Sequence, residues 1–252
     1  MRRPAQEIAD ALRTEIVSGR LKPGDQIPSE HELASQFQTT RTSAQKAVAR
    51  LKAEGHLISE QGRGAFVRPR PSIRMLSTGI NYRERRSDGR SNFNAEAAAQ
   101  GLRAEQRIKE VGSVSATPEI AKRLGIAEGD EVVARRHEFW IGDEPAQLCD
   151  GYYPTPVAAG TPLELPANIP GGAHAVIEPG AGLAARRIVQ FVEDLTVRMP
   201  TPDEVNVLRI PPGVPVVRIF RTAYDNRGQA VEVLDSVIPG DRHLFRYVID
   251  VP

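Results

Sequence analysis

The stretch IPSEHELASQFQTTRTSAQKAVARLKAEGHLISEQGRGAFV, which runs from Ile27 to Val67, contains two short helical patterns and then two short strand patterns. Ser29 is followed three residues later by Glu32, a capping-box pattern that predicts the start of the first helix. The pattern breaks at Gln38-Thr39-Thr40, where either threonine can cap the second helix, and that helix is expected to end near Gly55. Two short helices joined by a tight turn are typical of a helix-turn-helix.

A further helix and a hairpin flank this pair of helices. Apolar residues recur every four positions from Ile8 to Ile16, which predicts an amphipathic helix that ends near Gly19. The segments HLISE and AFVRP predict two strands joined by Gln61-Gly62-Arg63-Gly64. Three helices and a glycine-bearing hairpin make a winged helix-turn-helix, the fold expected for residues 1–70.

The second helix of the pair has a polar side that suits nucleic acid, formed by Arg41, Thr42, Gln45, Lys46 and Arg50. The first residues of such a helix enter a major groove, where Arg forks onto guanine, Gln pairs with adenine, and Thr or Lys holds phosphate. The glycines let the hairpin approach the sugar-phosphate wall while Arg63 reaches into a minor groove. Each of these side chains, taken alone, is more often an ordinary surface residue. Their occurrence together, in this order along a helix-turn-helix and a wing, favours double-stranded DNA as a partner.

The charge distribution agrees with this interpretation. The 252-residue chain has a net charge of +1, but residues 1–90 hold 17 Lys and Arg against 10 Asp and Glu, so they carry +7 and the remainder −6. Clustered basic residues displace condensed counterions from nucleic acid. Residues 71–90 are rich in Arg, Ser, Pro and Gly and predict a linker, whose segment RERRSDGR is either a solvated loop or a second phosphate contact.

The composition excludes several classes of protein. With 252 residues and 40% apolar residues, the chain suits two domains with a core in each. No run of about 18 apolar residues and no signal-peptide pattern occurs, so we expect a cytoplasmic protein without membrane contact. The single cysteine, Cys149, excludes a disulfide framework and a zinc-finger cluster, and we expect it to be a buried apolar residue rather than a reactive thiol. No metal or cofactor is expected.

The C-terminal part contains an internal repeat. TPEIAKRLGIAEGDEVVARRHEFW, from Thr117, aligns without a gap with TPDEVNVLRIPPGVPVVRIFRTAY, from Thr201. Each copy predicts a capped short helix, a glycine turn and a strand, and a second strand follows, AQLCDGYY in one copy and QAVEVLDSVI in the other. Two α-β-β units predict a pseudo-twofold, mostly antiparallel sheet with flanking helices for residues 91–252, which makes the whole chain α+β.

Polar groups on these apolar strands indicate small-molecule recognition rather than catalysis. The chain has no glycine-rich phosphate loop before a helix, no HExxH and no G-x-S-x-G. Converging charges orient a small polar ligand, although edge-strand charges or internal ion pairs explain each residue equally well. The candidate ligand-binding residues are Arg135, Arg136 and His137 in the first copy, Arg221 and Glu232 in the second, and His174 in the connecting segment GGAHAVIE.

About the first 68 residues resemble the winged helix-turn-helix of GntR-type bacterial transcription regulators, through IVSGRLKPGDQIPSEHELA, TTRTSAQKAV and EGHLISEQGRGAFV. The resemblance implies DNA contacts at the positions of Ser29, Thr40, Arg41, Thr42 and Gly62. His31 and Gln45 stand where the family often has Arg, and we expect Gln45 to favour adenine. The predicted DNA-binding residues are Ser29, His31, Thr40, Arg41, Thr42, Gln45, Lys46, Gly62, Arg63 and Gly64.

From about Met75 onward the chain resembles the effector-binding domain called UTRA, with a chorismate-lyase-like fold, which follows this head in the HutC-like branch. The similar segments are LGIAEGDEVVARRHEFWIGDEP, GGAHAVIE and RTAYDNRGQAVEVLDSVIPGDRHLFRY. The resemblance implies a pocket for a small metabolite, such as a sugar phosphate, an amino-acid derivative or a histidine-pathway acid, with contacts around Arg135 to His137 and at Glu232. The motif Arg-x-His replaces the commoner Arg-x-Arg and makes a phosphorylated sugar less favoured.

These patterns predict a homodimeric, sequence-specific transcription repressor that a small polar metabolite releases from a palindromic operator, with no enzyme activity. A dimer is expected because a single head of this kind buries little DNA surface. Two alternatives stay open. One is a constitutive DNA-binding repressor of a mobile or plasmid element with a vestigial pocket, and the other is an enzyme or sugar-binding protein with an accessory DNA-binding head.

Overall fold

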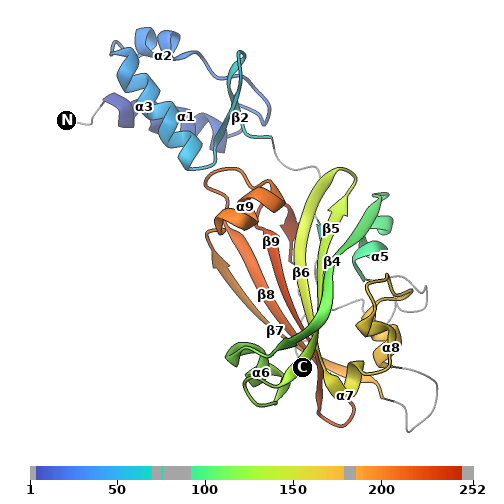
Figure 1. Cartoon of the computed structure of the whole chain (residues 1–252). Helices are drawn as coiled ribbons and strands as arrows, with labels where there is room; N and C mark the ends of the chain where they lie inside the picture. Colours follow the sequence, from blue (N-terminus) through green and yellow to red (C-terminus); the bar gives the residue numbers. More distant parts are fainter. Residues whose placement is uncertain (1–3, 70–74, 77–91, 179–185, 246–252) are drawn as a thin grey trace, which may run out of the picture. The chain divides into compact units, whose positions relative to one another are not determined.

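The computed structural model describes residues 4–69, 75–76, 92–178 and 186–245 (Figure 1). The chain forms two compact units, residues 1–72 with 199–215 and residues 73–198 with 216–252. The predicted linker, 71–90, and its Arg-rich segment lie outside the described residues, except for the two-residue strand β3 (Met75–Leu76).

The first unit begins with a winged helix-turn-helix, as the sequence predicts. Ser29 caps α2 in a capping box with Glu32, and Thr40 caps α3 by accepting a hydrogen bond from the main-chain N–H of Ser43. Because these caps join residues three apart, the local sequence alone determines where both helices start. The elements are α1 (Pro4–Val17), α2 (Glu30–Gln36), α3 (Arg41–Ala53), β1 (Leu57–Glu60) and β2 (Gly64–Val67).

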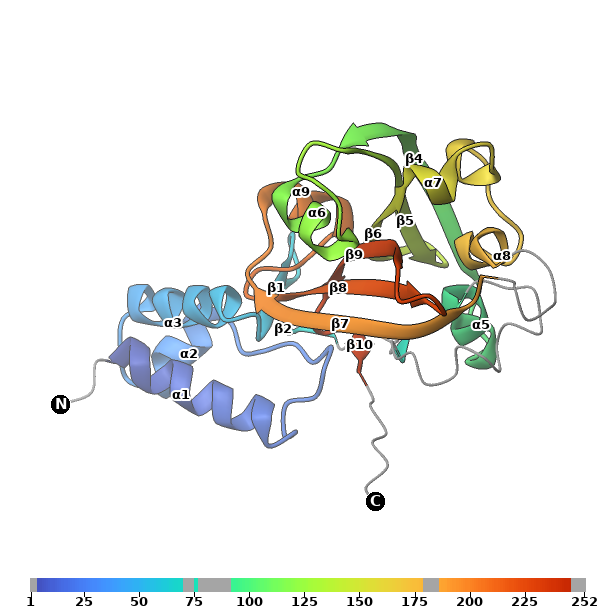
Figure 2. The ribbon, with the colours of Figure 1, turned by 90° about the horizontal axis from the view of Figure 1, so that it is seen from below.

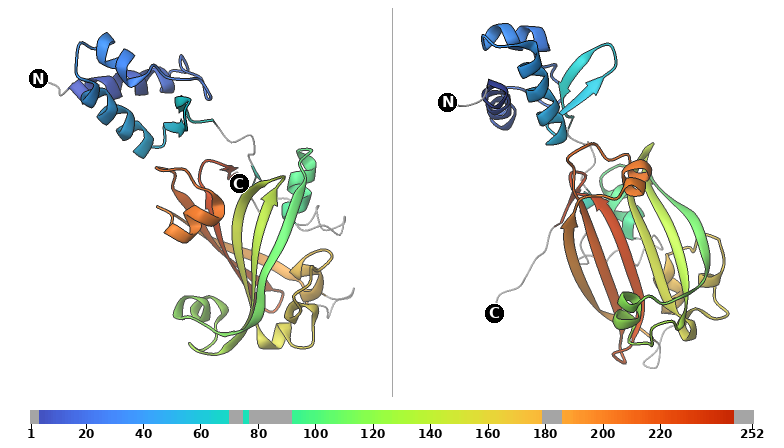
Figure 3. Two further views of the ribbon diagram at one scale, coloured as in Figure 1. Left: turned by 45° about the horizontal axis from the view of Figure 1, so that its top comes forward. Right: turned by 60° about the vertical axis from the view of Figure 1, so that its left-hand side comes forward.

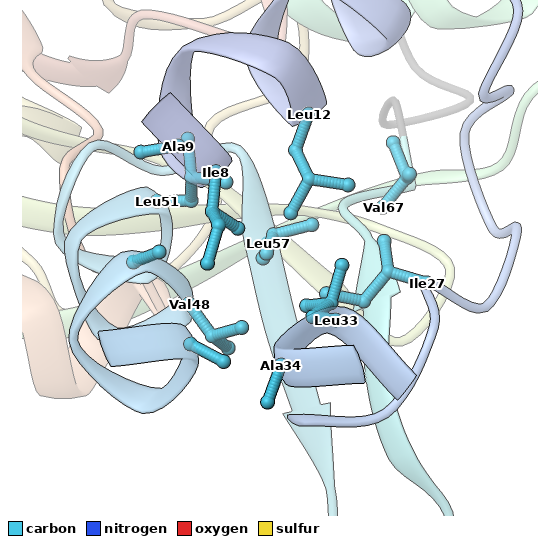
Figure 4. Close-up of a cluster of buried hydrophobic side chains, with 12 residues drawn as sticks. Ile8, Ala9, Leu12, Ile27, Leu33, Ala34, Val48, Leu51, Leu57 and Val67 are labelled. Carbon is cyan, nitrogen blue, oxygen red and sulfur yellow. The ribbon is translucent and has the colours of Figure 1, made fainter. Parts of the chain in front are cut away.

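Apolar side chains from the three helices and the hairpin meet in one core (Figure 4). Its larger members are Ile8, Leu12, Ile27, Leu33, Val48, Leu51, Leu57 and Val67. Strands β1 and β2 pair antiparallel and form the wing. Gln26 makes an isolated antiparallel bridge with Phe66, so the segment before α2 lies along β2, on the side away from β1.

The second unit is built on a six-stranded antiparallel sheet with the order β4-β5-β6-β9-β8-β7 (Figure 3). From one edge inward the strands are β4, β5 and β6, and from the other edge inward they are the equivalent strands β7, β8 and β9. The sheet therefore has a pseudo-twofold axis between β6 and β9. The repeat is thus longer than its sequence signature, because one unpredicted strand precedes each α-β-β unit. The strands are β4 (Ala104–Ser115), β5 (Glu131–Ile141), β6 (Glu144–Pro154), β7 (Ile188–Arg198), β8 (Val216–Asp225) and β9 (Ala230–Pro239).

Short helices flank the sheet. Thr117 caps α6 (Pro118–Leu124), as the repeat predicts. Thr201 caps the equivalent helix α9 (Pro202–Leu208), which lies in the segment 199–215 of the first unit. The remaining elements are α5 (Asn92–Ala99), α7 (Thr155–Ala158), the 3-10 helix η3 (Pro162–Glu164), α8 (Ala173–Ile177) and β10 (His243–Leu244), which pairs parallel with β3.

The two faces of the sheet are covered by different helices. On one face, Ile120 and Leu124 of α6 pack with Val132 and Phe220. On the opposite face, which we call the inner face, α7, η3 and α8 contribute to a core that also holds Tyr153, its members from these helices being Ala158, Leu163 and Ile177. The inner face is therefore covered by α7, η3 and α8.

Candidate functional site

The ten residues predicted to bind DNA are all exposed in the structure. On α3 the buried residues are Ala44, Ala47, Val48 and Leu51, so the helix presents Arg41, Thr42, Gln45 and Lys46 on its other side. Buried and polar positions alternate with the helical period, which leaves one continuous polar stripe at the start of α3. The geometry therefore keeps the predicted recognition stripe free of the core.

An ion pair joins the starts of α2 and α3. The Nε of Arg41 lies 3.3 Å from a carboxylate oxygen of Glu30, and the Arg41 side chain is 77% exposed. An exposed pair of this kind is worth about 0–1 kcal/mol, so it does not prevent Arg41 from binding another anion. The structure thus places Ser29, Glu30, Thr40 and Arg41 in one region of the head.

The other end of α3 is held by charges. Glu54 accepts hydrogen bonds from Arg50 at 2.8 Å and from Arg13 of α1 at 2.7 Å. These bonds lower the pKa of the Glu54 carboxyl group. Arg50, which lies on the polar side of α3, is therefore engaged in fastening α3 to α1, unlike the residues at the start of the helix.

The wing tip is shaped by Gln26, a residue that the sequence patterns do not single out. Its side-chain amide donates to the main-chain carbonyl of Arg63 at 2.7 Å. Gly64 has φ +112°, and a Cβ there would lie 3.0 Å from the same amide nitrogen. The guanidinium of Arg63 pairs with Glu60 and stacks over the Phe66 ring at 5.2 Å. The backbone angle of Gly64 favours glycine, since other residues rarely adopt it.

Strand pairing gathers most of the predicted ligand-binding residues on the inner face. Arg135 lies opposite Gly151, and His137 lies opposite Cys149, which in turn lies opposite Ser236. Directly opposed residues point to the same side of an antiparallel sheet. Arg135, His137, Tyr153 and Glu232 therefore share this face, although they come from β5, β6 and β9.

Arg136 does not belong to this group. It is next to Arg135 in β5, and successive side chains of a strand point to opposite faces. On its own face the Arg136 guanidinium lies 2.7 Å from Glu110 and 3.6 Å from Asp150, and its side chain is half exposed. Arg136 lies between Arg135 and His137 in the sequence, but its side chain points to the opposite face of the sheet. The prediction that all three residues contact one ligand therefore does not fit the strand geometry.

The guanidinium of Arg135 is occupied by main-chain carbonyl groups. It is buried and donates to the carbonyl oxygens of Leu163 at 2.8 Å, Leu165 at 2.7 Å and Ala167 at 2.8 Å. Burial lowers the pKa of this guanidinium. Arg135 thus holds the irregular segment around η3 onto the sheet.

The partly buried His174 and the buried Glu232 form a polar pair. The Nε2 of His174 lies 2.7 Å from a carboxylate oxygen of Glu232, so α8 is joined to β9 across the inner face. Burial raises the pKa of Glu232, but the charge and hydrogen bond of His174 and a hydrogen bond with Tyr153 outweigh it and lower the pKa overall. A Cβ at Gly151 would lie 2.6 Å from the Tyr153 hydroxyl, so this mid-strand glycine makes room for it. The sequence patterns did not single out Tyr153 as a site residue. The sequence feature that could have indicated it is Gly151, because a glycine within a strand is typical of a place where another group approaches closely.

His137 and Cys149 are buried and held in their neutral forms. Burial, with a contribution from the charge of Arg135, lowers the pKa of His137 to about 4. Burial raises the pKa of the Cys149 thiol to about 12. The predicted burial of Cys149 is therefore confirmed, and burial favours the thiol over the thiolate, which is the nucleophile of cysteine chemistry.

The inner face combines a carboxylate, imidazoles and a hydroxyl with apolar side chains. Arg221 of β8 also lies on this face, because it is opposite Leu234, which is opposite Gly151, and it forms an ion pair with Glu193 at 2.6 Å. Among the described residues, no group of His, Cys, Asp and Glu has the arrangement of a metal site. In the same part of the chain, no helix is long and apolar enough to cross a membrane.

Comparison with known families identifies both parts of the chain. A model of the gntR family of bacterial regulatory proteins matches residues 4–67, and a model of the UTRA domain matches residues 99–243. The chain belongs to the GntR family and carries a UTRA domain. This combination agrees with the HutC-like branch named from the sequence, and it confirms the predicted fold class.

Similar proteins are regulators of transcription. The HTH-type transcriptional repressor NagR of Bacillus subtilis is 28% identical, over 97% of this chain and 93% of that protein. The histidine utilization repressor of Pseudomonas aeruginosa is also 28% identical, over 94% of this chain and 87% of that protein. A solved structure described as a GntR-family transcriptional regulator covers 100% of this chain and 99% of its own, with a TM-score of 0.68 and 27% identity. This GntR-family chain is thus a transcription regulator of a family of repressors, and it is not an enzyme.

Proposed function

We propose that this GntR-family regulator is a homodimeric repressor that binds a palindromic operator and is released by a small polar metabolite. The observation that carries the proposal is the His174–Glu232 pair at 2.7 Å, partly buried on the inner face of a domain that follows an exposed predicted recognition helix. A polar pair with ligand-type hydrogen-bonding groups that is still partly open to solvent is a basis for coupling a metabolite to DNA binding.

Repression follows if the two heads match the half-sites only in the absence of the metabolite. Two copies of the head supply the phosphate and base contacts that one head lacks, and a twofold dimer requires a palindromic site. The names of the two relatives, both repressors, support repression as the direction of control. A metabolite that binds one dimer arrangement better shifts the population toward it and lowers operator affinity. Such a regulator acts in the cytoplasm, where the operator DNA is.

Selection of binding sites from random DNA with the full-length protein tests the proposal. We expect a palindrome with half-sites one helical turn, or a multiple of it, apart. Metabolites that raise the thermal unfolding midpoint are then added to the protein–operator complex. Release by one of them supports the proposal, whereas binding that no metabolite changes favours a constitutive repressor. Absence of any selected sequence contradicts operator binding itself.

A further inference from the structure

Two glycine residues that are far apart in the sequence meet within the first unit. Gly55 follows the end of α3, and Gly213 lies in the turn after α9, in the segment 199–215 that leads from β7 to β8 (Figure 2). A Cβ atom at Gly213 would lie 2.5 Å from the main-chain oxygen of Ala53 and 2.6 Å from the nitrogen of Gly55. A Cβ atom at Gly55 would lie 3.0 Å from the main-chain oxygen of Pro212. Main chain therefore packs against main chain, with no room for a side chain.

The internal repeat shows that this turn differs from its counterpart in the first copy. The main-chain N–H of Val214 donates to the carbonyl oxygen of Pro211 at 3.3 Å, which closes the turn 211–214. Gly213 is equivalent to Gly129 in the repeat, and both have positive φ angles, +75° and +86°. Within the described residues, a Cβ atom at Gly129 would meet nothing within 4 Å. The close contact is thus specific to the second copy.

The sequences of the two turns agree with this difference. The first copy has AEGDE at residues 127–131, with three acidic residues, which is typical of a turn in solvent. The second copy has PPGVP at residues 211–215, with three prolines and no charge. Because proline fixes its φ angle, the second turn is a stiff and uncharged surface that loses little conformational freedom when it packs.

The contact lies at the end of α3 that is away from the predicted DNA-binding residues. Those residues of α3 are within 41–46, at its start, whereas Gly213 contacts residues 53–55. The helix has 13 residues and rises about 1.5 Å per residue, so its ends are about 20 Å apart. The contact therefore leaves the predicted recognition stripe free and is compatible with bound DNA.

We propose that the turn 211–214 is a docking surface for the C-terminal end of α3, and that this contact couples the head to β7 and β8. The segment 199–215 is joined covalently to β7 at one end and to β8 at the other, so a movement of either strand acts on α3 through the turn. A head held in this way loses less freedom on binding DNA than an unrestrained head, so the contact raises operator affinity. This inference rests on the proposed control of operator binding by the second unit and names the contact that transmits it.

The first test compares alanine variants of the two equivalent glycines in the full-length protein. Gly213→Ala and Gly129→Ala have a similar backbone cost, because both glycines have a positive φ angle. Only at Gly213 does the new Cβ atom meet main-chain atoms, at 2.5 Å. We expect Gly213→Ala to lower affinity for the operator selected with the wild type about tenfold or more, measured by fluorescence anisotropy. Gly129→Ala should bind as the wild type does.

The second test approaches the same contact from the head. Gly55→Ala is matched with Gly19→Ala, since both glycines follow helices of the head and have φ +76°. Among the described residues, a Cβ atom at Gly19 would meet nothing within 4 Å. The conflict at Gly55, 3.0 Å from the Pro212 oxygen, is milder than that at Gly213. We therefore expect a smaller loss of operator affinity in Gly55→Ala, about threefold, and none in Gly19→Ala.

Hydrogen exchange followed by mass spectrometry, without DNA, tests the contact itself. Loss of the contact is expected to speed exchange in peptides that cover residues 50–56 and 209–215 of Gly213→Ala, compared with Gly129→Ala. A peptide from β9 should keep the wild-type exchange rate, which shows that the sheet is intact. This measurement needs no operator, so it separates the contact from the proposed function.

The outcomes distinguish the contact, its coupling role and the proposed function. Faster exchange at residues 50–56 together with weaker operator binding, in Gly213→Ala and in Gly55→Ala but in neither control, supports the inference. Unchanged exchange there overturns the contact, and faster exchange with unchanged operator affinity overturns the coupling role, while both results leave the proposed repressor standing. If Gly213→Ala does not fold, the milder pair Gly55→Ala and Gly19→Ala is judged by the same criteria. Failure to select any operator with the wild type overturns the proposed function and, with it, the coupling role.

Discussion

The side-chain amide of Gln26 donates a hydrogen bond to the main-chain carbonyl of Arg63 at 2.7 Å, and this bond fastens the segment before α2 to the tip of the wing. Gln26→Ala removes the bond and leaves the wing tip less ordered. We expect operator affinity to fall about 3- to 10-fold, the effect of one hydrogen bond worth about 1 kcal/mol. Fluorescence anisotropy with a labelled operator measures the change.

The control for this variant is Gln100→Ala, which removes the same side chain at an exposed position outside the head. It should bind operator as the wild type does. Unchanged affinity in Gln26→Ala would show that the wing does not need this bond to contact DNA.

The ion pair between Arg41 and Glu30 predicts opposite effects for its two partners. Arg41→Ala is expected to cost about 1–3 kcal/mol of operator affinity, because it removes a contact to guanine or phosphate. Glu30→Gln is expected to strengthen binding slightly, by at most about 1 kcal/mol, because an exposed pair that competes with DNA is lost. Arg107→Ala, which breaks an exposed ion pair on β4, is the control. Equal weakening by Arg41→Ala and Glu30→Gln would indicate a structural role for the pair.

Gln45 lies on the exposed side of α3 and is predicted to read adenine. Gln45→Arg exchanges an amide that pairs with adenine for a fork that pairs with guanine. We expect the sites selected from random DNA to change from A to G at one position of each half-site, with the rest of the palindrome retained. Identical selected sites from both proteins would exclude Gln45 as a base-reading residue.

The features that sequence patterns predicted correctly are local ones. The caps at Ser29, Thr40, Thr117 and Thr201 join residues three positions apart, so a short window of sequence contains both partners. The edge strands β4 and β7 were not predicted, because both are half exposed and lack a clear alternation of apolar and polar residues. Only the order of the strands in the sheet shows that each repeat contains a fourth element.

The inner face shows why a candidate site is harder to predict than a helix cap. Arg135 was predicted as a ligand contact, but its hydrogen bonds go to carbonyl groups of residues 162–167, an irregular segment with no sequence signature. The pairing of His174 with Glu232 joins residues 58 positions apart, and no local pattern relates them. Their residue types were identifiable from the sequence, but their partners were not.

The pKa of His137 predicts a loss of stability in acid. Its pKa is about 4 in the folded protein, mainly because of burial, against an ordinary value of 6.5. Below pH 6.5 the unfolded chain takes up a proton that the folded chain does not, so stability falls until the pH reaches the folded pKa. The expected loss is about 3 kcal/mol between pH 6.5 and pH 4, since one pKa unit corresponds to about 1.4 kcal/mol.

Urea unfolding of wild type and His137→Gln at several pH values measures this effect. The variant lacks the titrating group, so the stability difference between the two proteins should shift by about 3 kcal/mol in favour of the variant as the pH falls from 7 to 4. Other titrating groups, such as the buried His243, act equally in both proteins and cancel. Parallel pH profiles would show that His137 titrates normally in the folded chain.

The pair of His174 and Glu232 predicts a separation of effector response from DNA binding. Glu232→Gln keeps the size of the side chain but removes its charge, and His174→Ala removes the partner. Each is expected to raise the metabolite concentration needed for operator release about tenfold or more, consistent with about 1.5–3 kcal/mol for a hydrogen bond to a charged group. Operator affinity without metabolite should stay at the wild-type value, because the residues predicted to contact DNA are on the head. The control is Arg136→Ala, which changes the residue next to Arg135 but on the opposite face of β5, and which should respond as the wild type does.

Arg135→Ala is a poorer test, since it leaves buried carbonyl groups without donors and destabilises the domain whether or not a metabolite binds there. Release of DNA at the wild-type metabolite concentration by both Glu232→Gln and His174→Ala would place the effector site away from this pair.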